Sequence, residues 1–376
     1  MQHRVYFDNA STSNINPEIY ETYCRLLKEN YANSESLYEE GSSINRMMEK
    51  ARSAIAGLLE VSPDEIIFTS GSCESNTSAI KGVSLALPEK KHIITTAVEH
   101  SSIMNACSQM EKLFGYRVSY LPVDQSGKIR ISDLIEELDE DTALVSIMMV
   151  NNESGAINPI AEAGEYIKKH SHAYFHTDMT QAAGKLPLSM NNIDLASISA
   201  HKIEGLKGSG ILIKKRHVPF VPLICGGEQE SGMRGGTSNA VVNAMLAKTL
   251  RLAEEGRIQN HDRIAQMHDH LIEKLQEIPG IELNSPTDSV DSIINFSYEK
   301  IPSEVMQNAL NQKGFMVSAR STCDSHSVNP SYVLTAMGYS TRRASCCIRV
   351  SLSARNTIPE TDAFICALKE IIEHYG

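Results

Sequence analysis

Residues 195–202 read Leu195-Ala196-Ser197-Ile198-Ser199-Ala200-His201-Lys202, a short β-rich run at residues 195–199 followed by the polar side chains of His201 and Lys202. A second run, Ala173-Tyr174-Phe175-His176, ends in the same way, with Thr177-Asp178 directly after it. Short runs rich in apolar, β-branched and aromatic residues are typical of buried strands. Because ligands bind at the carboxyl ends of the strands in a parallel α/β sheet, these polar endings predict a functional edge.

Five further runs of this kind decide the fold class. They are Ile66-Ile67-Phe68-Thr69, His92-Ile93-Ile94-Thr95, Val118-Ser119-Tyr120-Leu121, the residues from Leu144 to Val150 and those from Gly210 to Ile213. Helical patterns lie between the runs, for example at residues 74–87 and 160–170. The alternation predicts βαβ units around one large, mostly parallel seven-stranded sheet in an α/β domain.

The last third of the chain follows a different pattern. Two long helices are predicted at residues 241–255 and 263–278, and beyond residue 290 strands and helices are mixed. That mixture predicts a smaller α+β domain. A length of 376 residues suits two domains. We therefore predict a large domain over residues 15–255 and a small domain made of residues 1–14 and 256–376.

Composition excludes several classes of protein. Apolar residues make up 41% of the chain and charged residues 22%, as in folded globular proteins. The 35 basic and 46 acidic residues give a formal net charge of −11, which offers nucleic acid no general attraction. The most continuous apolar stretch, residues 143–150, is far shorter than the ~20 residues of a membrane-spanning helix. We expect neither nucleic acid nor membrane as a partner.

The N-terminus and the cysteines favour the cytoplasm. Met1-Gln2-His3-Arg4 and the residues after it lack the apolar core of a signal peptide. The eight cysteines contain no CxxC pair, so their spacing suits neither a zinc site nor a disulfide framework, and no metal is expected. Most of the cysteines are expected to be reduced and buried.

The turn after the run at residues 66–69 has the features of an anion site. Thr69-Ser70-Gly71-Ser72-Cys73-Glu74-Ser75-Asn76 places a glycine and several hydroxyls before a predicted helix. Free backbone N–H groups and the positive end of the helix dipole bind anions there, most often phosphate. An ordinary helix N-cap explains the same segment equally well.

Asp178 and Lys202 have simple explanations when each is taken singly. Asp178 would cap a helix, and Lys202 would be a solvated surface lysine. Together with the turn at Ser72, they supply a phosphate cradle, a carboxylate and an amine at neighbouring strand ends. These are the parts that hold pyridoxal phosphate (PLP): the amine forms a Schiff base, the acid keeps the pyridine nitrogen protonated, and the helix end takes the phosphate.

A set of ordered motifs extends this interpretation along nearly the whole chain. The motifs occupy residues 6–12, 69–76, 99–102, 150–153, 176–185, 199–208, 226–237 and 348–352. With these motifs in this order, the chain resembles the cysteine desulfurases of the NifS/IscS type, which are members of the class V aminotransferase family. The resemblance implies the type I PLP-dependent transferase fold, with a large sheet domain and a smaller α+β domain.

The resemblance implies roles for the residues that would react with the substrate. Lys202 matches the Schiff-base lysine, Asp178 the partner of the pyridine nitrogen, and His100 the residue that stacks on the ring and moves protons. Gln181 and Asn152 match contacts to the phenolic oxygen and the bound amino acid. Arg349 matches the arginine that grips the substrate carboxylate. Without the other motifs, Arg349 would be an ordinary strand arginine.

Five further positions match the family's phosphate-binding residues. They are Ser72, Cys73, Ser199, His201 and Thr237. The position of Thr237 is one that reaches the phosphate of the other subunit in the family. The resemblance therefore implies a homodimer with shared sites.

The resemblance implies that Cys323 is the nucleophile. Residues 317–334 are similar to the family's cysteine loop and have the length found in its IscS-like branch. The polar residues around Cys323 predict an exposed thiol that is able to ionise. Cys346 and Cys347 lie beside a predicted strand and are expected to pack in the core.

Several positions depart from the family pattern. Arg320 and Thr322 replace a glycine and an alanine before the cysteine, and Tyr38 replaces a histidine. Cys73 replaces a threonine, so either a weaker donor meets the phosphate or Cys73 packs beneath the turn while a backbone amide makes that contact. Arg355 is displaced by one place. None of these changes removes a group that the chemistry requires.

The resemblance implies a PLP-dependent enzyme that converts L-cysteine to L-alanine. Sulfur would pass to Cys323 as a persulfide and then to an acceptor protein, such as an iron–sulfur scaffold or a tRNA-thiolation enzyme. Alternatives within the fold are a selenocysteine lyase, another lyase or an aminotransferase. An alternative of another class is a catalytically degenerate sulfur-transfer scaffold. Retention of the reactive residues argues against it.

Overall fold

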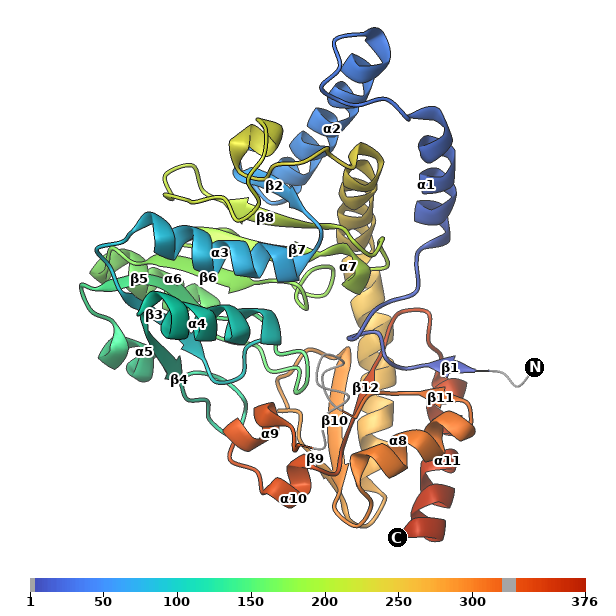
Figure 1. Ribbon diagram of the computed structural model, residues 1–376. Helices are drawn as coiled ribbons and strands as arrows, with labels where there is room; N and C mark the ends of the chain where they lie inside the picture. The colour runs from blue at the N-terminus through green and yellow to red at the C-terminus, as the bar shows by residue number, and fades with distance from the viewer. Residues whose placement is uncertain (1–3, 320–328) are drawn as a thin grey trace.

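The computed structural model describes residues 4–319 and 329–376, and Figure 1 shows them arranged in a larger and a smaller lobe. The strands of the large sheet are β2 (Ile66–Thr69), β3 (His92–Thr96), β4 (Arg117–Leu121), β5 (Thr142–Ser146), β6 (Tyr174–Asp178), β7 (Leu195–Ser199) and β8 (Gly210–Lys214). Their spatial order is β2-β8-β7-β6-β5-β3-β4. The strands from β3 to β7 pair in parallel, whereas β8 runs antiparallel to β2 and β7. The prediction of a mostly parallel seven-stranded sheet is confirmed.

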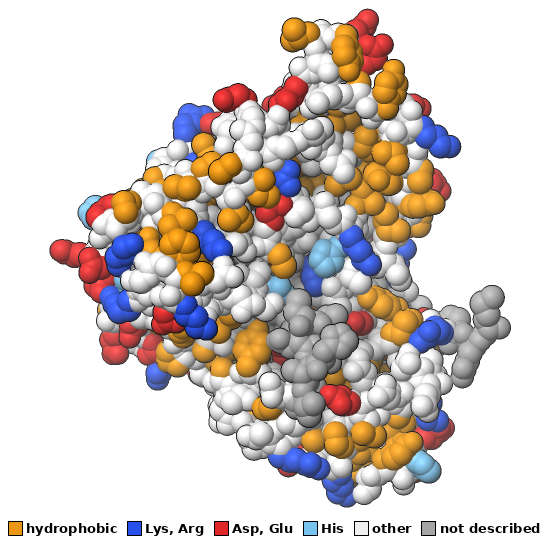
Figure 2. Space-filling view, in the orientation of Figure 1, with side chains coloured by type: hydrophobic (Ala, Val, Ile, Leu, Met, Phe, Trp, Pro, Cys, Tyr) orange, Lys and Arg blue, Asp and Glu red, His pale blue; other side chains and the backbone are white. Residues whose placement is uncertain are grey.

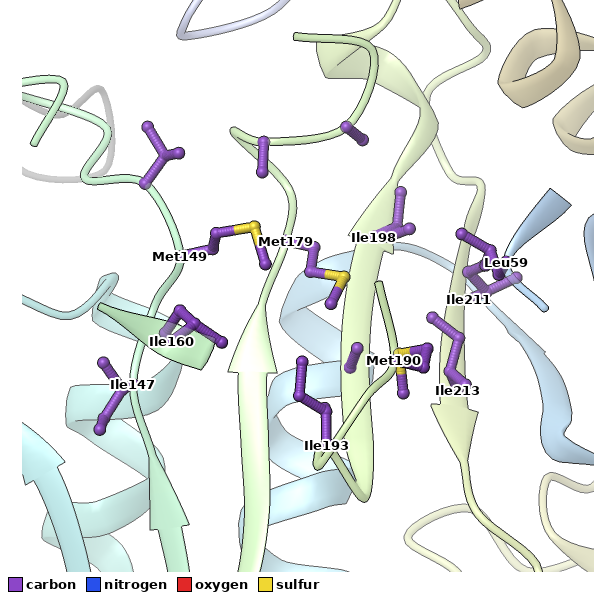
Figure 3. Packing of buried hydrophobic residues seen from close by; sticks show 14 of the residues in the cluster. Leu59, Ile147, Met149, Ile160, Met179, Met190, Ile193, Ile198, Ile211 and Ile213 are labelled. Atoms are coloured by element: carbon purple, nitrogen blue, oxygen red, sulfur yellow. The ribbon is translucent and has the colours of Figure 1, made fainter. Parts of the chain in front are cut away.

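Helices cover both faces of this sheet. They are α3 (Ser72–Ala86) and α4 (Ser101–Phe114) on one face, and α2 (Glu39–Leu58), α5 (Ile131–Glu137), α6 (Ile160–His170) and α7 (Ala240–Gln276) on the other. Strand residues alternate between the two faces: on β2, Ile67 packs toward α3, while Ile66 and Phe68 pack toward α2. Figure 3 shows the core on the side of α2, with Ile198 of β7 beside Ile211 and Ile213 of β8.

The long helix α7 runs unbroken through residues 240–276, so the prediction of two separate helices is wrong. The intervening residues 256–262 include a glycine and several polar side chains but no proline. A glycine inside a helix costs only about 1 kcal/mol and removes no backbone hydrogen bond. α1 (Pro17–Glu29) and α2 pack against α7. Within the described ranges, none of the helices has the length and apolar character required to cross a bilayer.

The smaller lobe mixes short sheets and helices, as predicted. Its elements are β1 (Val5–Tyr6), β9 (Ile281–Leu283), β10 (Ile293–Tyr298), α8 (Ser303–Gln312), β11 (Phe315–Met316), α9 (Tyr332–Ala336), α10 (Thr341–Ala344), β12 (Cys347–Ser351) and α11 (Ile358–Tyr375). β1 pairs in parallel with β11, and β10 lies between β9 and β12 in an antiparallel sheet. Phe7, Phe296 and Phe364 belong to a core of its own.

The predicted boundaries at residues 14 and 255 stay a prediction. α7 crosses residue 255 and contributes to both cores, with Leu250 in the larger and Leu271 in the smaller. Ala10, assigned by prediction to the small domain, packs in the larger core.

The strand predicted at residues 144–150 is too long at its C-terminal end. β5 ends at Ser146, although the Ile147 N–H still donates to the His176 carbonyl. Residues 147–150 are all buried, and Ile147, Met149 and Val150 pack in the large core, where Figure 3 shows Ile147 and Met149. Apolar character alone therefore does not mark where the strand ends.

The expectation that most cysteines are buried is wrong for the described residues. The buried ones are Cys107, Cys346 and Cys347; Cys24 is partly buried, and Cys73, Cys225 and Cys366 are exposed. A thiol side chain is small, so leaving it exposed forfeits little apolar burial. The expectation that Cys346 and Cys347 pack in the core is confirmed.

Two glycines allow β8 to pass directly against the turn after β2. Gly71 adopts a φ of 145°, and a Cβ on Gly210 would lie 2.5 Å from the Gly71 Cα. No side chain fits between two backbones at that separation, so the start of α3 rests directly on β8. The position of the turn thus depends on this contact.

Gly210→Ala is therefore expected to lower the free energy of unfolding by about 1–3 kcal/mol, the usual cost of overpacking. Gly57→Ala is the matched control, since a Cβ at this exposed position of α2 meets nothing within 4 Å. The control should be stabilising by about 0.5–1 kcal/mol. Urea unfolding followed by circular dichroism measures both, and equal changes would contradict the role of the contact.

Candidate active site

The carboxyl ends of the strands face a cavity of about 310 Å³ at the junction of the two lobes. Nine of the twelve candidate site residues line it: Ser72, Cys73, His100, Asn152, Asp178, Gln181, His201, Lys202 and Arg349. These residues come from both lobes, with Arg349 on β12 and the others on the large domain's strand ends, helix starts and loops. The topology thus gathers residues that are up to 277 positions apart (349 − 72).

The turn between β2 and α3 leaves the start of the helix open. Gly71 is the N-cap residue, and among the residues described no side chain caps the first turn. Ser72 and Cys73 open the helix and line the cavity. An N-cap residue is thus present, as the alternative of an ordinary N-cap expects, but it contributes no side-chain hydrogen bond. Uncapped N–H groups at a helix start fit an anion such as phosphate.

Cys73 is exposed at the cavity, which contradicts the alternative that it packs beneath the turn. The space beneath the turn is filled instead by Ser199, whose Oγ would lie 3.3 Å from a Cβ on Gly71. Ser199 is 2% exposed and supports the turn from below without lining the cavity. Its predicted phosphate contact stays a prediction.

Asp178 ends β6 with its carboxylate held by two N–H groups. Oδ2 accepts a hydrogen bond from Asn76 Nδ2 at 2.7 Å, and Oδ1 accepts one from the Thr180 backbone N–H at 2.9 Å. Asp178 therefore orders a turn and not a helix start, and it faces the cavity. This position suits a partner for a protonated ring nitrogen.

Asn76 links Asp178 to His100. Asn76 Nδ2 also donates to Ser102 Oγ at 3.0 Å, and that oxygen lies 2.8 Å from His100 Nδ1. His100 is the N-cap of α4, and its Nδ1 accepts from the Ser102 backbone N–H at 3.2 Å. These contacts turn the opposite side of the imidazole away from the helix, so Nε2 is the nitrogen placed to exchange protons with a ligand.

Two histidines close to Asp178 and Lys202, the buried His176 and the partly buried His201, have lowered pKa values. His176 bridges Ser146 and Ser197, and burial lowers its pKa to about 4. Burial lowers the pKa of His201 to about 4 as well, assisted by the charge of Lys202. Neither imidazole therefore adds a positive charge next to Asp178 in the physiological range.

Lys202 lies in a short 3₁₀ helix, η2 (Ala200–Lys202), directly after β7. Its Nζ donates to the carbonyls of Ala10 and Ser11, both at 2.6 Å. The alternative of a solvated surface lysine is therefore wrong. The N-terminal segment holds this amine at the cavity, where it is available to a carbonyl compound.

Arg349 is 1% exposed and is held from two sides. Nη1 donates to the Asn152 carbonyl at 2.7 Å, while Nη2 donates to Asp8 Oδ1 at 2.9 Å and to Ser11 Oγ at 2.6 Å. The alternative of an ordinary strand arginine does not describe this residue. Its guanidinium faces the cavity with Nε still available to an anionic ligand.

Three buried atoms at the cavity lack a partner among the residues described. They are Asn152 Oδ1, Thr180 Oγ1 and Arg349 Nε. A buried polar atom without a hydrogen bond costs about 1–3 kcal/mol, so a polar ligand that satisfies all three would be stabilised. An open helix start, a carboxylate, an amine and a guanidinium fit PLP together with an amino-acid carboxylate.

Besides Ser199, two candidate residues are not brought into this set. Thr237 is exposed on a loop and does not line the cavity, so its predicted contact requires a second subunit. Cys323, with the departures Arg320 and Thr322, lies outside the described residues.

Sequence reasoning missed four residues that the structure adds to the site. Asn76 and Thr180 lie within quoted motifs, while Asp8 and Ser11 lie in the motif at residues 6–12. For Asn76, the signal was its position one helical turn after Ser72, which puts both on one face of α3. The contacts of Asp8 and Ser11 with Arg349 join the two ends of the chain and left no local signal.

Comparisons with known proteins agree with this geometry. The family model described as aminotransferase class-V matches residues 5–364. A cysteine desulfurase IscS from Methanosarcina thermophila is 39% identical over 98% of this chain and 92% of its own length. A solved NifS-like protein is 35% identical, covers 99% of this chain and 100% of its own, and superposes with a TM-score of 0.93. SspA, solved in complex with cysteine, is 31% identical over 94% and 99%, with a TM-score of 0.83.

The chain therefore belongs to the class V aminotransferase family, and within it to the PLP-dependent cysteine desulfurases of the NifS/IscS type. The predicted type I PLP-dependent fold is confirmed.

Lys202→Ala is expected to abolish both covalent cofactor attachment and cysteine turnover, because Lys202 carries the amine next to the cavity. Borohydride reduction followed by peptide mapping should label Lys202 in the parent protein. Lys207→Ala, at an exposed position five residues on, is the control and should keep the label. A label on Lys185 or Lys207 would contradict the assignment.

Proposed function

We propose that this enzyme converts L-cysteine to L-alanine and leaves the sulfur atom on Cys323 as a persulfide. The substrate C–S bond breaks, an S–S bond to Cys323 forms, and the electron pair of the broken bond stays with the substrate carbon, which is reprotonated. When bound, PLP supplies the electron sink that makes this cleavage accessible. The observation that carries the proposal is the single cavity lined by Lys202, Asp178, His100 and Arg349.

Each residue of the chain has a distinct task in this proposal. Arg349 holds the substrate carboxylate, and Asn152 orients the bound amino acid. Lys202 provides the amine that the substrate displaces, and His100 Nε2 carries protons. Asp178 keeps the ring nitrogen protonated, and Gln181 contacts the phenolic oxygen. The open start of α3, with Ser72, Cys73, Ser199 and His201, binds the phosphate.

Relatives support L-cysteine as the substrate. The Methanosarcina thermophila relative carries the name cysteine desulfurase, and SspA was solved with cysteine bound. The assembled cavity disfavours a degenerate scaffold, because the reactive groups are arranged around it. Product analysis with cysteine, selenocysteine and a keto acid distinguishes the desulfurase from a selenocysteine lyase or an aminotransferase.

We propose that the persulfide sulfur passes to an acceptor protein, either an iron–sulfur scaffold or a tRNA-thiolation enzyme. The relative's name IscS and the NifS-like neighbour support a sulfur-delivering role. Assays of sulfide and alanine with each candidate acceptor separate the two. We also propose a cytoplasmic location, where reduced thiols persist.

Cys323→Ser is expected to retain cofactor and bind cysteine but to lose persulfide formation, since a hydroxyl is far less ionised than a thiol at neutral pH. Mass spectrometry after brief exposure to cysteine should place one extra sulfur on Cys323 in the parent protein. Cys225→Ser, at an exposed position that does not line the cavity, is the control. Extra sulfur on Cys73 or Cys347 in an active Cys323→Ser protein would disprove the assignment.

We propose that the enzyme acts as a homodimer. Apolar side chains are exposed along α1 and before α2, among them Tyr20, Leu27, Tyr31, Leu37 and Tyr38. Figure 2 shows orange side chains gathered over α1 and the upper end of α2. Contiguous apolar surface of this kind is typical of a protein–protein interface. The exposed position of Thr237 fits a contact with the partner's phosphate.

The double variant Tyr31→Glu with Leu37→Glu is expected to shift the protein from dimer to monomer, because two charges would be buried at the interface. Analytical ultracentrifugation measures the mass. Leu113→Glu, at an exposed leucine on α4, is the control and should stay dimeric. A monomeric parent protein at micromolar concentration would rule out the homodimer.

A further inference from the structure

Lys185 is a lysine near the active site that the proposed chemistry does not use. It follows β6 and lines a cavity of about 130 Å³ that also borders Thr249 and Ser292. It does not line the 310 Å³ cavity of the proposed active site. Burial, together with the charges of Lys202 and Arg349, lowers its pKa to about 7. An amine shielded from water next to two other positive charges lowers the stability of the fold unless it makes a compensating hydrogen bond.

That contact is with Gln181. Lys185 Nζ donates a hydrogen bond to Gln181 Oε1 at 2.7 Å. Gln181 Nε2 donates to the Ala10 carbonyl at 2.9 Å, and the same carbonyl accepts from Lys202 at 2.6 Å. One hydrogen-bonded chain therefore runs from Lys185 through Gln181 to the segment that holds the reactive lysine.

The chain of contacts determines which way the amide of Gln181 faces. The Ala10 carbonyl can only accept, so it requires the amide nitrogen, and the amide oxygen is left to accept from Lys185, whose Nζ carries N–H groups in either charge state. Flipping the amide would place acceptor against acceptor at Ala10 and, when Lys185 is charged, donor against donor at Lys185. The amide nitrogen has a second N–H besides the one that the Ala10 carbonyl accepts, and Gln181 lines the active-site cavity.

We propose that Lys185 is a positioning residue, which acts through Gln181 to keep an N–H donor directed at the phenolic oxygen of the cofactor. The proposal rests on the proposed function, in which Gln181 makes that contact. An N–H donor stabilises the negatively charged oxygen and so favours the unprotonated form of the linkage between Lys202 and the cofactor. Losing the donor should raise the pH at which this linkage titrates.

The test is a pH titration of the visible absorbance of the holoenzyme. Lys185→Met keeps the length of the side chain but removes the donor, and the midpoint is expected to rise by about one pH unit, the equivalent of one lost hydrogen bond to a charged acceptor. Lys169→Met removes an exposed lysine paired with Glu165 and is the control, with no expected shift. Steady-state KM and kcat for cysteine are measured in parallel.

A second comparison separates positioning from a general effect of charge. In a Gln181→Ala background, Lys185→Met is expected to cause no further shift, because the amide on which Lys185 acts is absent. Lys185→Gln keeps an N–H donor without a charge, so its midpoint should stay close to that of the parent. If Lys185→Met fails to fold, Lys185→Leu takes its place, because it also removes the donor and is expected to raise the midpoint.

The outcomes that overturn the proposal are distinct from failure of the proposed function. An equal shift in both backgrounds, or a Lys185→Gln shift as large as that of Lys185→Met, would mean that the charge acts directly and not through Gln181. An unchanged midpoint in Lys185→Met would likewise exclude the positioning role. If the proposed function itself is wrong, the parent protein shows no lysine-linked absorbance and no desulfuration.

Discussion

The guanidinium of Arg349 joins three segments that lie far apart in the chain. It contacts the Asp8 carboxylate, the Ser11 hydroxyl and the Asn152 carbonyl while remaining 1% exposed. A buried charge is costly unless it is paired and hydrogen-bonded, so the N-terminal segment and the loop after β5 must both be in place around it. The same N-terminal segment supplies the carbonyls that hold the reactive lysine. The cavity is therefore complete only when both lobes are folded against each other.

Much of the fold could be predicted from local pattern, because the strands of a parallel sheet are buried on both faces and appear as short continuous apolar runs. β2 and β7 have the predicted bounds, residues 66–69 and 195–199. The errors arise where packing decides a boundary. Residues 147–150 are buried although the strand has ended, and α7 continues through Gly256 with Leu250 in the larger core and Leu271 in the smaller.

The site could be predicted as a set because β6 and β7 are parallel neighbours whose ends meet at one edge. That topology brings Asp178 and Lys202 to one cavity, and it excludes the simple explanation of each. Side-chain contacts between segments could not be predicted. Asn76 on α3 donates to both Asp178 at the end of β6 and Ser102 on α4. These contacts depend on side-chain rotamers and on the order of strands in the sheet, and the spacing of residues in the sequence reveals neither.

Arg355, which is displaced by one place from the family pattern, is a departure that lies outside the active-site cavity. Its Nε and Nη2 donate to Glu204 at 2.8 and 2.6 Å, so it ties the end of β12 to the loop after Lys202. Glu204 adopts a φ of 63°, a strained value for a residue with a side chain, and Ser13 Oγ accepts from its N–H at 2.7 Å. The side chains of the pair are 41% and 28% exposed, so solvent limits its worth to about 1 kcal/mol or less. Neither Arg355 nor Glu204 lines the active-site cavity, so this departure affects how firmly the lobes are joined. Cys73 does line the cavity, so that departure affects what the cavity can bind.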